Sequence, residues 1–237
     1  MNHELRCSTC GGLMPKATDT VVVVGNGPSL RETPLVDLSR FYTTIGVNRI
    51  HLIYPDTSWR PEHWVIADRS GATEWETDVP VHVGHGYTCW VREDMCVFRQ
   101  WYTAPNLRVV RDCSHIDIDH EHADRWHLED PEKPICKQGG SVHAAIQIAV
   151  KQLAAKRILI VGCDMGFQAN KVNHFSPDYV NVDYYEPQRM NLVIRNLDHC
   201  WRIARDECEA RGVELLNAGI GGELDTLSRV NVYDYLT

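Results

Sequence analysis

Short runs of apolar residues recur along the chain, and most of them end in a glycine or a short polar residue. The clearest is residues 21–24, four valines followed directly by Gly25 and Asn26. Continuous apolar runs of this kind are typical of strands that are buried on both faces, as in parallel sheets. The pattern also predicts strands at residues 43–48, 63–68, 157–164 and 213–217, with weaker examples at residues 79–83 and 107–110.

Two longer stretches place their apolar residues at helical spacing. After Gly139 and Gly140, Ser141 begins a segment with an apolar face that repeats every three to four residues. Residues 188–211 form the second amphipathic stretch, and Ser29 is expected to cap a short helix after the first strand. Because strands alternate with helices, we predict an α/β fold: a Rossmann-like parallel sheet with helices on both faces and an irregular, lid-like insertion.

The length of 237 residues fits one large domain. Residues 1–19 are polar and show no periodicity, so they are predicted to be a tail without regular structure. Residues 20–237 are predicted to form a single nucleotide-binding α/β domain. Within it, residues 84–137 and 165–187 lack a regular pattern and are predicted to be irregular or lid segments.

Charge and hydropathy narrow the range of partners. The net charge of −8 weighs against nucleic-acid binding through a basic face. No apolar run is long enough for a transmembrane helix, and the first residues lack the apolar core of a signal peptide, so we expect a cytoplasmic protein. The sequence is compatible with a homo-oligomer but does not specify one.

Short polar residues stand at the carboxyl ends of the predicted strands. In open parallel sheets, ligands bind outside these ends. We therefore expect the polar side chains there to converge on a binding site. They are Asn26, Asn48, Asp68, Asp164 and Asn217.

The turn that follows the four valines is the main candidate for a nucleotide contact. Gly25 and Gly27 let the backbone approach a ligand closely, and amide groups at the start of the next helix favour an anion. Pro28 has no amide proton, so the Ser29 hydroxyl and neighbouring amides would be the donors. The alternative is a simple strand-to-helix turn, since neither the lysine of a phosphate loop nor a complete dinucleotide fingerprint is present.

Four motifs, in this order, resemble those of the bacterial lipooligosaccharide sialyltransferases. They are Val-Val-Gly-Asn-Gly-Pro-Ser-Leu at 23–30, Gly-Val-Asn-Arg at 46–49, Gly-Gly-Ser-Val at 139–142 and Ile-Val-Gly-Cys-Asp-Met at 160–165. The chain also resembles two related groups, the motility-accessory-factor glycosyltransferases and the 6-hydroxymethylpterin diphosphokinase-like proteins. Residues 216–230 are similar to these two groups in particular.

The resemblance implies a glycosyltransferase that moves a sugar from a nucleotide-sugar donor, a CMP-sugar, to an acceptor hydroxyl. It implies that His174 is the general base, and an imidazole can accept a hydroxyl proton at neutral pH. Together with the strand-end pattern, it gives a predicted nucleotide-binding set of Gly25, Asn26, Gly27, Ser29, Asn48, Asp68, Gly140, Ser141 and Asp164.

Two alternatives stay open. A pyrophosphoryl transfer enzyme similar to 6-hydroxymethylpterin diphosphokinase would use ATP and Mg²⁺, with Asp68 or Asp164 on the metal, whereas the glycosyltransferase needs no tightly bound cofactor. A non-catalytic nucleotide-binding protein is the other alternative. The His- and Asp-rich residues 115–122 suit either a divalent metal or a solvated loop, and Cys7 and Cys10 resemble half of a zinc site.

Overall fold

The computed structural model describes residues 16–67, 84–92, 106–110, 126, 128–132, 135–136, 139–166, 173–179 and 187–236. Over these residues the chain forms a seven-stranded sheet in which every pairing is parallel. The predicted α/β fold with a parallel sheet is confirmed. Its strands are β1 (Ala17–Val24), β2 (Tyr42–Val47), β3 (His63–Ile66), β4 (Thr88–Arg92), β5 (Leu107–Val110), β6 (Arg157–Val161) and β7 (Glu214–Asn217).

The order of the strands is β5-β4-β3-β2-β1-β6-β7. The chain builds the sheet outward from β1 to β5, then crosses to the other side of β1 and adds β6 and β7. The direction of growth therefore reverses beside β1. In open α/β sheets such a reversal is the usual position of a ligand crevice.

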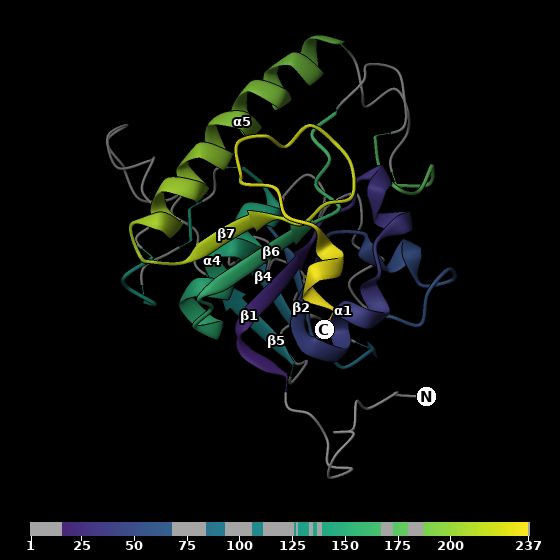
Figure 1. The fold of residues 1–237 in the computed structure, drawn as a ribbon, viewed down its shortest axis with the longest axis horizontal. Helices are drawn as coiled ribbons and strands as arrows, with labels where there is room; N and C mark the ends of the chain where they lie inside the picture. The colour runs from purple at the N-terminus through teal and green to yellow at the C-terminus, as the bar shows by residue number, and fades with distance from the viewer. Residues whose placement is uncertain are drawn as a thin grey trace.

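Helices cover both faces of the sheet (Figure 1). The α-helices α4 (Ser141–Leu153) and α5 (Pro187–Glu209) pack on one face, where Val21 and Val23 of β1 point. Val22 and Val24 point to the other face. That face is covered by α1 (Leu35–Phe41) and the 3₁₀ helices η1 (Pro28–Glu32), η2 (Ile50–Ile53) and η8 (Val232–Tyr235).

The four valines of β1 are at most 1% exposed, which explains why the run is apolar without alternation. Five of the tryptophans are also buried in the two cores: Trp59, Trp64, Trp90, Trp126 and Trp201. None of the described helices is long and apolar enough to cross a lipid bilayer.

Three expectations need correction. The tail was expected to reach residue 19, but β1 begins at Ala17, since its first residue pairs with Tyr42 ahead of an irregularity in the ladder. Residues 84–137 were expected to be irregular apart from a weak strand at residues 107–110. That strand is confirmed as β5, but the segment also contains β4, which was not expected. The sequence pattern missed β4 because this short strand has only one buried β-branched residue, Val91, beside the buried Cys89 and Trp90.

The third correction concerns Ser29, which was expected to cap a helix. The residue that precedes η1 is Gly27, and no side chain caps this 3₁₀ helix. Ser29 lies inside η1, and its side chain is used elsewhere, as described below. The α-helix begins only at Leu35, after Pro34.

Candidate functional site

Except for Asp68, which lies outside the described residues, the predicted nucleotide-binding residues lie at the carboxyl ends of β1, β2 and β6 and at the start of α4, and they fall into two groups. We call Asn26, Asn48, Gly140 and Ser141 the β2–α4 junction, because they join the ends of β1 and β2 to the start of α4. We call Gly25, Gly27, Ser29, Gly162 and Asp164 the β1–β6 junction, because they follow those two strands. The two groups differ in where their hydrogen bonds go.

Asn48 and Ser141 are joined directly at the β2–α4 junction. The Ser141 hydroxyl donates to Asn48 Oδ1 at 2.6 Å and accepts from the backbone N–H of Ala67 at 2.9 Å. The ends of β2 and β3 and the start of α4 are thereby held together. Asn48 has φ 50°, a left-handed conformation that asparagine tolerates better than most residues, and no hydrogen-bond partner is found for its Nδ2 among the described residues.

Asn26 lies beside this pair and retains an unused acceptor. Its Nδ2 donates to the carbonyl of Val47 at 3.0 Å, which fixes the orientation of the amide. Its Oδ1 is buried and has no partner in the described part of the chain, and the whole residue is 7% exposed. Burying an acceptor without a hydrogen-bond donor costs about 1–3 kcal/mol of folding free energy. A ligand that donates an N–H or O–H to this oxygen offsets that cost, and this favours binding.

The N-terminus of α4 supplies donors at the same junction. Gly139 and Gly140 have φ of 97° and 103°, values that glycine adopts readily, and this turn directs the chain into the helix. No side chain caps α4, and its first intrahelical bond is made by Ala144. The first-turn amides thus combine free N–H groups with the positive end of the helix dipole, an arrangement that favours anions. A Cβ added at Gly140 would meet no atom within 4 Å, so space is open in front of this turn.

The β1–β6 junction is packed and satisfied by protein groups. The amides of Gly25 and Gly27 donate to the carbonyls of Val161 at 2.8 Å and Gly162 at 2.7 Å. A Cβ at Gly27 would lie 2.5 Å from Asp164 Oδ2, so only glycine fits between the two loops. The amides that were expected to meet a phosphate are engaged within the protein.

Ser29 and Asp164 complete this junction. The Asp164 carboxylate accepts the Ser29 amide at 2.7 Å through Oδ2 and the Ser29 hydroxyl through Oδ1. The backbone carbonyl of Asp164 also accepts from the amide of Glu223, at 2.5 Å. The two residues were expected to hold a nucleotide; in this structure they are hydrogen-bonded to each other, between the segments that follow the adjacent strands β1 and β6.

His174 lies in a described segment, residues 173–179, that packs against the ends of β1 and β2. The amide of Phe175 donates to the carbonyl of Asn26 at 2.9 Å, which ties the segment to the candidate site. The His174 ring is stacked on Tyr179, with 3.8 Å between ring centroids and 7° between planes. Burial lowers the pKa of His174 to about 4, so the ring is neutral at pH 7 and able to accept a proton, although as a weak base.

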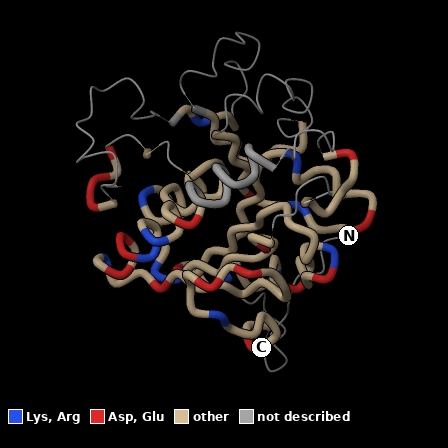
Figure 2. Tube along the Cα trace, turned by 90° about the horizontal axis from the view of Figure 1, so that it is seen from above, with Lys and Arg blue, Asp and Glu red and all other residues tan. Residues whose placement is uncertain are grey.

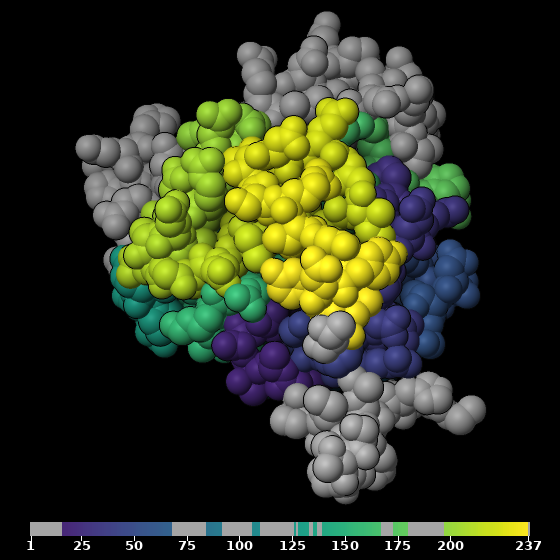
Figure 3. Space-filling model, in the orientation of Figure 1, coloured from purple at the N-terminus to yellow at the C-terminus, as the bar shows by residue number. Residues whose placement is uncertain are grey.

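The remaining predicted residues either bond within the protein or lie outside the described residues. Asn217 is 1% exposed and does not supply a ligand group: its amide donates to Leu224 at 2.8 Å and its oxygen accepts from Gly219 at 2.9 Å. It anchors the C-terminal residues, which cover the surface between α5 and α1 (Figure 3). Asp68, Cys7, Cys10 and residues 115–122 lie outside the described residues. Within the described part, no group of three or more His, Cys, Asp or Glu is placed to hold a metal ion.

The sequence analysis missed two arginines that lie next to predicted site residues. Arg31 and Arg49 both donate to backbone carbonyls of residues 173–179. The available signal was their position, because Arg31 directly follows the first motif and Arg49 is the last residue of the Gly-Val-Asn-Arg motif. Acidic and basic residues are interspersed over the molecule as a whole (Figure 2), so these two cations are distinguished by their location and not by a basic face.

Comparison with known proteins gave no match to a protein-family model, a curated protein or a solved structure.

Proposed function

We propose that the β2–α4 junction binds a nucleotide and that the protein is a glycosyltransferase acting on a nucleotide-sugar donor. The observation that carries this proposal is the spare hydrogen-bonding capacity gathered there: the buried Asn26 Oδ1, the Asn48 amide and the uncapped first turn of α4. A nucleoside monophosphate carries groups that match these: hydrogen-bond donors on its base and ribose for the Asn26 oxygen, and an anionic phosphate for the first turn of α4.

The occupied carboxylate of Asp164 favours sugar transfer over pyrophosphoryl transfer. A Mg²⁺-dependent kinase needs carboxylate oxygens that are free to ligate the metal. Both oxygens of Asp164 accept hydrogen bonds from Ser29. A CMP-sugar, which the motif resemblance favours as donor, places its single phosphate at the N-terminus of α4 without a metal.

The proposed reaction needs one base and one stabiliser of negative charge. The oxygen of the acceptor hydroxyl forms a bond to the anomeric carbon, while the bond from that carbon to the phosphate oxygen breaks and CMP leaves with the electron pair. The proton of the hydroxyl passes to the neutral ring of His174. The first-turn amides of α4 stabilise the charge that develops on the departing phosphate. A phosphate bound close to His174 raises the pKa of the ring and so makes it a stronger base.

The first experiment measures thermal stabilisation by CMP, UDP, GDP and ATP, each with EDTA and with Mg²⁺. We expect stabilisation by CMP without metal. Release of CMP from CMP-sugars is then followed with a panel of hydroxyl acceptors, in wild type, His174→Ala and His199→Ala, whose exposed side chain on α5 makes it the control.

Each outcome decides between the alternatives. Loss of transfer in His174→Ala alone supports the proposal, and full transfer in that variant removes His174 as the base. Stabilisation by ATP only with Mg²⁺ would replace the proposal with the kinase alternative. Stabilisation by CMP without transfer to any acceptor would favour a non-catalytic nucleotide-binding protein.

A further inference from the structure

Residues 173–179 are held in place more firmly than their loop conformation suggests. Phe175 and Tyr179 are 4% and 3% exposed, and Asn173 and Ser176 are buried as well. The segment makes internal bonds, from the Tyr179 amide to the Ser176 carbonyl at 3.3 Å and from the Asp178 amide to the Ser176 hydroxyl at 3.2 Å. It is a compact unit whose position is set by what it contacts outside itself.

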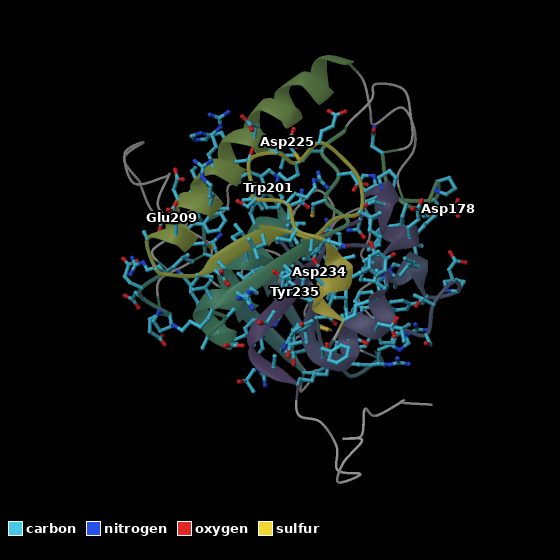
Figure 4. The ribbon with its side chains drawn as sticks, in the orientation of Figure 1. Asp178, Trp201, Glu209, Asp225, Asp234 and Tyr235 are labelled. Atoms are coloured by element: carbon cyan, nitrogen blue, oxygen red, sulfur yellow. The ribbon has the colours of Figure 1, made fainter. Side chains whose placement is uncertain are left out.

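Beside the bond from the Phe175 amide to the Asn26 carbonyl, two arginine side chains hold the segment from outside. Arg31 donates through Nε to the Phe175 carbonyl at 2.7 Å. Arg49 donates through Nη1 to the carbonyls of Asp178 and Tyr179, each at 2.8 Å. Asp178 lies on the side of the molecule where η1 and α1 pack, across the view from Glu209 at the end of α5 (Figure 4).

The two arginines follow the predicted nucleotide contacts in the sequence. Arg49 is the residue after Asn48, whose Oδ1 is bonded to Ser141. Its guanidinium fixes the backbone of Tyr179, and the ring of Tyr179 is the surface on which His174 rests. A short chain of contacts therefore leads from the β2–α4 junction through Arg49 and Tyr179 to His174.

We propose that Arg49, assisted by Arg31, is a positioning residue that couples occupation of the nucleotide site to the placement of His174. A ligand that accepts a hydrogen bond from the Asn48 amide shifts the adjoining backbone of Arg49. Because the Arg49 guanidinium is bonded to residues 173–179, this shift displaces that segment, and the His174 ring moves with Tyr179. The catalytic meaning of the coupling rests on the proposed function, whereas the positioning of His174 does not.

Arginine suits this role because its planar group binds two neighbouring carbonyls in fixed geometry, while lysine is a point charge on a flexible stem. Arg49→Lys is therefore expected to restore only part of what Arg49→Met loses. Arg60 provides a matched control, since it also donates through Nη1 to two backbone carbonyls, those of Thr57 at 2.9 Å and Trp59 at 2.6 Å. Neither of those carbonyls belongs to residues 173–179.

The experiment is an NMR titration of the His174 ring in ¹⁵N-labelled protein, with and without CMP. In the wild type we expect a pKa of about 4, raised by CMP. In Arg49→Met the ring is no longer held on Tyr179, so the pKa moves toward about 6.5, the ordinary value for histidine. CMP still stabilises this variant thermally, with a Kd within about threefold of wild type, but it shifts the His174 titration less than in the wild type, because the ring is no longer held in one place relative to the phosphate. Arg60→Met leaves both titrations as in the wild type.

An unchanged His174 titration in Arg49→Met would overturn the positioning role. A shift by CMP in this variant as large as in the wild type would overturn the coupling. If Arg49→Met does not fold, Arg31→Met is put through the same titrations and judged by the same two criteria. Failure of CMP to bind the wild type would count against the proposed function, while the titrations without CMP still decide whether Arg49 positions His174.

Discussion

The β1–β6 junction and the β2–α4 junction carry the same types of residue, glycine, serine and short polar side chains, but use them differently. At the β1–β6 junction the groups bond to one another: Ser29 to Asp164, and Gly27 to Gly162. At the β2–α4 junction, the Asn26 oxygen and the first turn of α4 keep capacity that no described protein group uses.

The comparison shows that residue type at a strand end does not identify a binding group. A group with a structural role differs from a group that can bind a ligand in whether its hydrogen bonds are already made within the protein. The glycines differ in the same way. Gly27 is needed because Asp164 leaves no room for a Cβ, whereas Gly140 has open space and is needed for its φ of 103°.

The largest effect is expected from a methyl group placed in the packed junction. Gly27→Ala puts a Cβ 2.5 Å from Asp164 Oδ2 and should destabilise the fold by about 3 kcal/mol, measured by urea unfolding. Gly84→Ala is the control, because a Cβ there meets nothing within 4 Å, and should stay within about 0.5 kcal/mol of wild type. Equal stability of the two variants would mean that the β1–β6 junction is not closely packed.

Acid should affect the region around α4 and His174. Burial lowers the pKa of both His143, in the first turn of α4, and His174 to about 4. Between this value and the unfolded value of about 6.5, the unfolded chain binds more protons, so stability falls as the pH drops. Each histidine should account for about 2 kcal/mol between about pH 7.5 and about pH 5.

The check is the free energy of unfolding as a function of pH. His143→Phe retains an aromatic ring beside Trp126 and Trp201 but cannot titrate, so the loss of stability in acid should be roughly halved. His199→Gln, an exposed position on α5, should leave the pH dependence unchanged. A His143→Phe variant as acid-sensitive as the wild type would show that His143 is not held neutral by burial.

A pair of small substitutions tests which junction binds the nucleotide. Asn48→Gly keeps the left-handed backbone and removes the amide, and should weaken CMP binding at least about tenfold in calorimetry. Ser29→Ala leaves Asp164 short of a donor and should lower stability by about 1–2 kcal/mol, with a change in Kd of less than about twofold. The reverse pattern would move the nucleotide to the β1–β6 junction.

The smallest effect is expected from magnesium. Because both Asp164 oxygens are bonded to Ser29, adding Mg²⁺ should change the Kd for CMP by less than about twofold relative to EDTA. Calorimetric titration of CMP under the two conditions measures this. A gain of tenfold or more with Mg²⁺ would show that a carboxylate of the site is available to a metal.

Much of the fold could be predicted from local pattern. The continuous apolar runs of β1 and β6 predict strands, because both faces of each strand are covered. Gly140 and Ser141 predict the start of α4. β4 could not be predicted in this way, since Cys89 and Trp90 owe their place in the sheet to pairing with β3 and β5.

The positions of the candidate site residues could be predicted, but their hydrogen-bond partners could not. Sequence pattern brought Asn26, Asn48 and Ser141 to one edge of the sheet, and the structure places them there. It could not show that Ser29 is satisfied by Asp164, because that bond joins residues 135 positions apart. Whether a strand-end residue is free for a ligand is decided by such distant contacts.

The central position of β1 has a consequence for biosynthesis. Its Val22 pairs with Thr44 on one side and with Leu159 on the other. At a translation rate of about 5–20 residues per second, the second partner leaves the ribosome on the order of ten seconds after the first strand. Throughout that interval a strand that ends in four valines has one edge unpaired, and such an edge is a template for aggregation. The nascent chain is therefore expected to need shielding by a chaperone until β6 has emerged.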